Sequence, residues 1–290
     1  MKNKSSLQYL INNFVEFLLS IVGILLLGSI PSLFIGMKIN VGNYVSQLEE
    51  IFSKLFGSES LVYSNGYTTR PLFPQILHHY KETMLLFFIS FLCSILISII
   101  ITSLYFNINN KMKKKVRSLV FLLNGIPDII LIIISQLIVI HIFKITGIEM
   151  ANVASSYDDR AIFLPIIILC IPTSLMYIKF FIFRCEEQSN NYYVIFSKSK
   201  GLNDTYIFFI HILRNIFFSA FQFIKSNIWF VFSNLYIIEY FFAIPGIFSF
   251  IKTYPTVEVF TVGLLLLYIP IYLIYKSINI IIPSIWGGVR

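Results

Sequence analysis

Charged side chains are scarce in this sequence, because Asp, Glu, Lys and Arg make up only 12% of its 290 residues. Hydrophobic residues account for 57%, and the mean hydropathy is +0.80. A soluble globular domain has about 25% charged residues and a lower share of apolar side chains. The composition therefore excludes an ordinary soluble domain and predicts an integral membrane protein.

Cysteines and catalytic motifs are also lacking. The three cysteines, Cys93, Cys170 and Cys185, have unrelated spacings and fall in or beside apolar runs, which indicates packing rather than disulfides or zinc binding. No Gly-x-x-x-x-Gly-Lys-Ser/Thr loop is present to hold ATP phosphates, and no His-Glu-x-x-His or Gly-x-Ser-x-Gly motif indicates a hydrolase. We therefore expect a protein that is not an enzyme, with no catalytic residue, metal site or cofactor of its own.

Long apolar runs are what the sequence has instead. About 20 apolar residues suffice to cross a hydrocarbon core of about 30 Å as a helix. The runs predict an all-α, polytopic membrane protein that forms one domain over residues 1–290. Its six expected transmembrane helices cover residues 14–37, 83–106, 118–143, 161–183, 216–243 and 259–283.

Basic residues predict the orientation of these helices. The formal net charge is +8, and five basic residues crowd between the second and third runs. They are Lys111, Lys113, Lys114, Lys115 and Arg117. Loops rich in Lys and Arg stay in the cytoplasm, so we interpret this cluster as a topology signal and not as a nucleic-acid site. Both termini and residues 184–215 are then cytoplasmic, and residues 38–82 form an extracytoplasmic loop in which residues 49–56 have helical periodicity.

The cytoplasmic loop 184–215 has the pattern of a helix, a break and a second helix. Gly201 can adopt the left-handed conformation that ends a helix, and Asn203 or Asp204 can cap the helix that follows. Such an element gives a rigid knob at the membrane surface. A knob of this kind can fit a groove on another subunit.

The order of residues in this loop resembles a known family. Tyr193, Val194, the tripeptide Lys200-Gly201-Leu202, His211 and the tripeptide Leu213-Arg214-Asn215 stand at the spacing of the cytoplasmic coupling loop of ABC importer permeases. The resemblance is to the oligopeptide, dipeptide and nickel branch of that family.

A second stretch supports the same resemblance. Glu239, followed by Pro245-Gly246-Ile247, is similar to the family pattern Val-Glu-x-x-Phe-x-x-Pro-Gly-Leu, and Tyr254-Pro255 falls where the family has Asp-Tyr-Pro. The chain departs from the pattern at residues 195–197, where Ile, Phe and Ser replace Glu-Ala-Ala, and at residues 282–284, where Ile-Pro-Ser replaces Asp-Pro-Arg.

The resemblance implies a type I ABC importer permease that moves short peptides across a bacterial cytoplasmic membrane. It implies a second homologous permease, two ABC ATPase subunits that bind ATP and Mg, and an extracytoplasmic solute-binding protein, with lipid around the spans and no nucleic acid. The resemblance assigns an ATPase-coupling role to one run of residues. These are Ser197, Lys198, Ser199, Lys200, Gly201, Leu202, Asn203 and Asp204.

Three other functions remain open at this point. A nickel or metal-chelate permease belongs to the same branch. An ion-gradient-driven transporter with Asp128 as its relay is a different class, although such a carrier has no need of the Lys200-Gly201-Leu202 motif. A non-transporting membrane scaffold is the third, and the apolar pair Ile195-Phe196 in the coupling loop favours it.

Polar residues inside the apolar runs are candidates for a translocation path or for contacts between helices. A charge at the centre of a bilayer costs about 2.5 to 3.5 kcal/mol on insertion scales. Asp128 and Lys225 each lie about ten residues from the inner end of the expected helix, or ~15 Å deep, so we expect them to pair or to share a polar path. Glu239 lies near an outer end, where a structural role and substrate contact remain equally open. Lys179 can extend to the cytoplasmic surface.

Overall fold

The computed structural model describes residues 2–35, 38–57, 60–64, 66–156 and 159–286. The described chain is helical apart from two short antiparallel strand pairs, which confirms the predicted all-α polytopic class. Within the described residues, six segments are long and apolar enough to cross a membrane. They are Ile11–Leu33, Gln75–Asn107, Asp128–Thr146, Phe163–Ser189, Asp204–Phe241 and Val257–Ser277.

The chain divides into two compact units, and we describe each by itself. Unit 1 consists of Met1–Glu82 and Gly246–Tyr272, and unit 2 of Thr83–Pro245 and Leu273–Arg290. Two helices, α3 (Gln75–Asn107) and α12 (Val257–Trp286), contribute residues to both units.

Unit 1 contains the N-terminal helix, the predicted outer loop and the start of α12. Helix α1 (Lys2–Ser29) ends in a 3-10 turn at Ile30–Leu33, where Pro31 removes a backbone donor. The outer loop is folded rather than irregular. Its elements are β1 (Phe34–Ile35), β2 (Lys38–Ile39), α2 (Val41–Phe56), β3 (Val62–Ser64) and β4 (Thr69–Pro71), and α11 (Ile247–Thr253) joins them from later in the chain.

Side-chain contacts hold the outer-loop elements to α11 and α12. The buried Tyr63 ring lies 5.2 Å from the ring of Phe250 and 4.8 Å from that of Tyr254. Lys54 on α2 donates to Glu258 on α12 at 2.9 Å and also pairs with Glu50. Hydrogen bonds to Glu50 and Glu258 raise the pKa of the Lys54 ammonium. The stability that the charged ammonium gains from them is therefore present at neutral pH and is lost as the pH rises through this raised pKa.

Helices α1 and α12 approach closely because α1 has a glycine at the contact. A Cβ atom at Gly28 would lie 2.0 Å from the hydroxyl oxygen of Thr261. Small residues at such crossings allow membrane helices to pack backbone to backbone. Further along, the Tyr272 hydroxyl donates to the backbone carbonyl of Asn13 at 2.9 Å.

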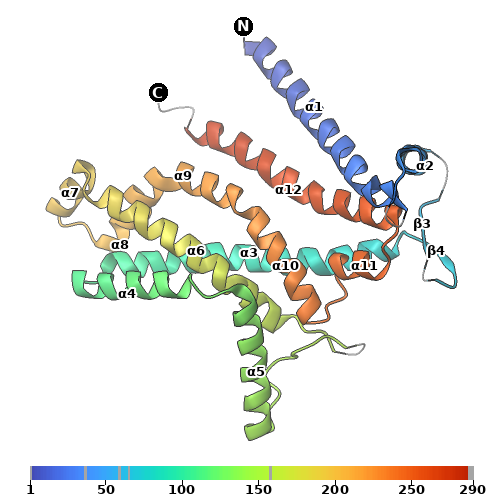
Figure 1. Cartoon of the computed structure of the whole chain (residues 1–290). Coiled ribbons are helices and arrows are strands. Elements are labelled where there is room, and N and C mark those ends of the chain that lie inside the picture. Colours follow the sequence, from blue (N-terminus) through green and yellow to red (C-terminus); the bar gives the residue numbers. More distant parts are fainter. Residues whose placement is uncertain (1, 36–37, 58–59, 65, 157–158, 287–290) are drawn as a thin grey trace. The chain divides into compact units, whose positions relative to one another are not determined.

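Unit 2 carries the remaining helices. They are α4 (Asn110–Leu123), α5 (Asp128–Thr146), α6 (Phe163–Ser189), α7 (Tyr192–Ser199), α8 (Asp204–Tyr206), α9 (Leu213–Ser226) and α10 (Ile228–Phe241). Helix α6 is the centre of the unit and buries large side chains such as Tyr177 and Phe181. Helix α5 runs away from α4 and α6 (Figure 1) and is almost wholly exposed, so lipid or another subunit must cover it in a membrane.

Two of the expected transmembrane helices are interrupted, which corrects the sequence boundaries. The expected helix 118–143 is divided between α4 and α5 by a break at residues 124–127, since Pro127 lacks an N–H and disfavours helix in the residue before it. The side-chain amide of Asn124 donates to the carbonyls of Val120 (2.9 Å) and Leu175 (3.2 Å).

The expected helix 216–243 is divided in the same way. Helix α9 ends at Ser226 and α10 begins at Ile228. The Asn227 side chain donates to the Phe223 carbonyl at 2.7 Å. Local bonds of this kind between an Asn side chain and the backbone compete with the hydrogen bonds of a helix.

Candidate functional site

A surface knob, residues 192–206, occupies the centre of the predicted cytoplasmic loop. Helix α6 extends to Ser189, so residues 184–189 of the predicted loop belong to this helix. Gly201 has φ +75°, which confirms the predicted left-handed break. The Gly201 amide donates to the Lys198 carbonyl at 2.9 Å and the Leu202 amide to the Ser197 carbonyl at 3.3 Å, which satisfies the end of α7.

The second half of the knob begins at Asn203. Its side-chain oxygen accepts from the Thr205 amide at 3.0 Å, so Asn203 is the cap of α8. Asp204, the other predicted cap, instead pairs with Lys198 across the glycine at 3.2 Å. Both side chains are largely exposed, so the ion pair contributes at most about 1 kcal/mol to the stability of the fold. Helix α8 continues through a π-helical turn, Ile207–Ile212, into α9.

The outer face of the knob carries apolar side chains among exposed polar ones such as Lys198, Lys200 and Asn203. Val194 and Ser197 are buried, and the Ser197 hydroxyl donates to the Tyr193 carbonyl at 2.7 Å. Large apolar side chains on the same element point outward. The exposed ones are Tyr192, Ile195, Phe196, Leu202 and Tyr206. A cluster of this kind on an ordered element marks a contact surface for another protein.

The knob is fastened to the end of α3. The Lys198 ammonium lies 5.1 Å from the centre of the Phe106 ring, and the Thr205 hydroxyl donates to the side-chain oxygen of Asn107 at 3.2 Å. Gly201 therefore lies between Lys198 and Thr205, the two residues that contact α3. The knob thus contacts the last turn of the 33-residue helix α3.

Asp128 and Lys225 have different neighbours, so the predicted pairing is wrong in this structure. Asp128 is the first residue of α5, where the positive end of the helix dipole favours a carboxylate, and its neighbour is the Asn234 side chain. Lys225 lies in the last turn of α9, with its ammonium 4.7 Å from the centre of the Tyr275 ring. Similar depth did not bring the two charges together because they project towards different helices.

Glu239 is buried, with 1% of its surface exposed. It accepts a hydrogen bond from the Thr83 hydroxyl, and its backbone carbonyl accepts from the Ile244 amide at 3.0 Å, which closes the turn after α10. Sequence reasoning missed Gln136, whose amide donates to the Phe241 carbonyl at 3.1 Å and supports the same turn. The position of Gln136, a polar residue within the apolar run of α5, could have indicated this contact.

The apolar spans and the ordered knob define a polytopic membrane protein. Residues 94–285 match the family described as binding-protein-dependent transport system inner membrane component. The chain belongs to this family. No similar sequence was found among curated proteins.

Membership in the family gives the chain a general function. It is a permease component of an ABC importer, with the type I permease fold, in the inner membrane. Permeases of this family are not themselves catalytic, and the family implies ATPase and solute-binding partners. The matched residues include the knob, the turn after Glu239 and both interrupted spans.

Proposed function

We propose that this chain is one half of a permease pair that imports short peptides. A second homologous permease completes the pathway, two ATPase subunits bind ATP and Mg, and an extracytoplasmic protein delivers the peptide. The resemblance of the loop and of the Glu239 turn to the oligopeptide and dipeptide branch supports the peptide substrate.

The observation that carries the proposal is the apolar, anchored knob. Its exposed Ile195 and Phe196 suit an apolar groove on an ATPase subunit, and its contacts with Phe106 and Asn107 hold it to α3. When the ATPases close on ATP, the knob moves with them and displaces α3. Rigid elements that move in this way turn a permease pair between inward-open and outward-open states.

Contacts at the end of α3 support the proposed orientation of the chain in the membrane. The ammonium groups of Lys113 and Lys198 lie 5.3 Å and 5.1 Å from the centre of the same ring, Phe106. The lysine-rich start of α4 and the knob are therefore on the same side of the membrane. Since Lys-rich segments stay inside, we place the knob and both termini in the cytoplasm.

Site-directed crosslinking combined with uptake tests this function. A cysteine in place of Phe196 should crosslink to a copurifying ATPase, whereas one in place of Tyr67, which is 96% exposed in unit 1, should not. Cells with the intact system should accumulate labelled short peptides in an ATP-dependent manner. Uptake of nickel without peptide would correct the substrate, and absence of any bound ATPase would contradict the coupling role.

A further inference from the structure

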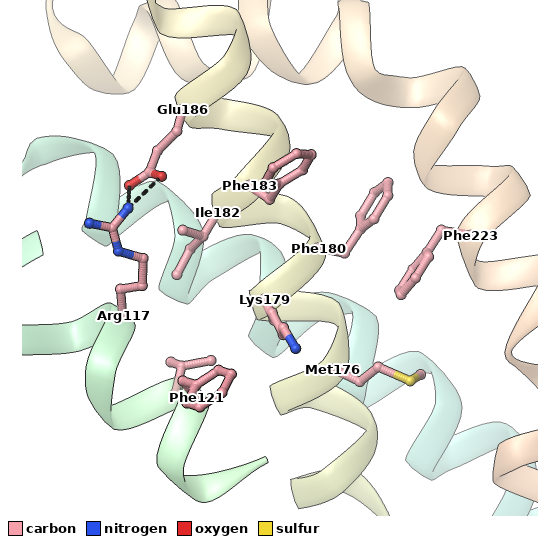
Figure 2. Close-up of a pocket in the computed structure, with 10 residues that line it drawn as sticks. Arg117, Phe121, Met176, Lys179, Phe180, Ile182, Phe183, Glu186 and Phe223 are labelled. Carbon is pink, nitrogen blue, oxygen red and sulfur yellow. Dashed lines mark hydrogen bonds and ion pairs between the residues drawn. The ribbon is translucent and has the colours of Figure 1, made fainter. Parts of the chain in front are cut away.

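A pocket of about 480 Å³ opens between α4, α6 and α9 (Figure 2). Its walls are mostly aromatic and aliphatic. On one side the rings of Phe180 and Phe223 stack at 4.2 Å with an angle of 9° between their planes. Phe121, Met176 and Phe183 complete the apolar lining.

Two cations border this apolar space. Arg117 donates to Glu186 at 3.0 Å, and Glu186 also accepts from the Tyr105 hydroxyl. Lys179 is exposed, and its ammonium lies 5.4 Å from the centre of the Phe121 ring. Among the residues that the structure describes, no carboxylate pairs with Lys179. The pocket thus holds one positive charge that the protein leaves uncompensated.

Along α6, the apolar lining residues Phe180, Ile182 and Phe183 lie between the polar lining residues Lys179 and Glu186. Glu186 lies near the end of α6, Lys179 is seven residues earlier and Met176 ten residues earlier. At 1.5 Å per residue these positions are ~10 Å and ~15 Å along the helix. A ligand that suits these walls carries an anion beside Lys179 and hydrocarbon against the neighbouring rings of Phe180 and Phe223.

The surroundings favour an anionic ligand over a neutral one. Helix α4, which forms one wall, contains five basic residues and no Asp or Glu. Basic pockets between membrane helices on the cytoplasmic side suit the headgroups of acidic lipids, whose phosphate is attracted by each nearby Lys or Arg.

We propose that this pocket binds an anionic phospholipid of the cytoplasmic leaflet. Its phosphate lies between Arg117 and Lys179, and an acyl chain follows the stacked rings of Phe180 and Phe223. Only the choice of leaflet rests on the proposed function, because it uses the orientation given above. The lipid would cover apolar surface that α4, α6 and α9 leave open.

Native mass spectrometry of the full chain, purified with its accompanying subunits, tests the assignment. Phosphatidylglycerol and phosphatidylcholine with the same acyl chains are titrated in turn. Phosphatidylglycerol should be retained preferentially, and Lys179→Gln should weaken its binding about fivefold, the effect of one basic residue near a lipid phosphate. Lys179→Arg should restore binding. Lys114→Gln is the matched control, because Lys114 is an exposed cation of α4 that does not line the pocket.

Three results would overturn the proposal. They are equal retention of the two lipids, equal losses in Lys179→Gln and Lys114→Gln, and crosslinking of a Phe183→Cys variant to a second permease in native membranes. The last would show that protein covers the pocket. The titration needs neither peptide nor ATP, so a failure of peptide uptake with selective lipid retention would count against the proposed transport function alone.

Discussion

At the scale of single residues, Gly201 combines a left-handed backbone conformation with the proposed coupling role. Its φ of +75° is unfavourable for a side chain with a Cβ atom, although a Cβ there would have nothing within 4 Å. Gly201→Val should therefore act through backbone strain of about 1–2 kcal/mol and not through a clash. We expect transport and transport-linked ATP hydrolysis in proteoliposomes to fall together by several-fold.

The control for this change is Gly201→Asn, because Asn tolerates the left-handed region. It should retain most of the activity of the unaltered chain. Full activity of Gly201→Val in an assembled complex would contradict the coupling role of the knob.

Thr83 and Glu239 give a second prediction at this scale. Both side chains are buried, and the Thr83 hydroxyl donates to the Glu239 carboxyl. Thr83→Val keeps the shape but removes a donor to an acidic group, so we expect a loss of about 1–3 kcal/mol in the free energy of unfolding. Thermal unfolding in detergent measures it. Thr83→Ser should unfold like the unaltered chain, and an unchanged melting temperature in Thr83→Val would show that the bond contributes nothing.

At the scale of elements, the contact of α1 with α12 depends on one glycine. Gly28→Ala would drive a methyl group into Thr261, whereas Gly23→Ala on the same helix would meet nothing within 4 Å. Both changes raise helix propensity equally, so their difference isolates the packing. Gly28→Ala should destabilise unit 1 by about 1–3 kcal/mol, and Gly23→Ala should not.

A second change tests whether Thr261 is the cause. Its buried hydroxyl makes no hydrogen bond within the described residues, so Thr261→Ala removes the obstacle at little cost. Adding it to Gly28→Ala should restore part of the stability in the same unfolding assay. Equal melting temperatures for Gly23→Ala and Gly28→Ala would mean that the helices do not meet at this point.

At the scale of the whole molecule, the proposed topology rests on the lysine cluster of α4 and its contact with the end of α3. Single cysteines at the exposed positions Ser64 and Ser156 should react with an impermeant thiol reagent added outside intact cells. A cysteine at the exposed Ser199 should react only after the membrane is opened. The unaltered chain, whose native cysteines lie within apolar helices, gives the background. Reversed labelling would invert the proposed orientation.

Local features of the site were predictable from the sequence because a few neighbouring residues decide them. The helix end at Gly201 and the Asn203 cap of the next helix are made by bonds between residues two to five positions apart. The separate neighbours of Asp128 and Lys225 were not predictable, since depth in a span says nothing about which neighbouring helix a side chain faces. Their partners, Asn234 and Tyr275, come from other helices.

The sequence by itself determined that this protein spans a membrane with six helices, that it has a helix–glycine–helix knob, and which family it resembles. These properties depend on hydrophobic run length, on a positive φ and on the local order of residues. Only the tertiary structure decided that Ile195 and Phe196 point outward and that α4, α6 and α9 leave a pocket beside Lys179. Those features depend on contacts between residues far apart in the chain, which a pattern along the chain does not encode.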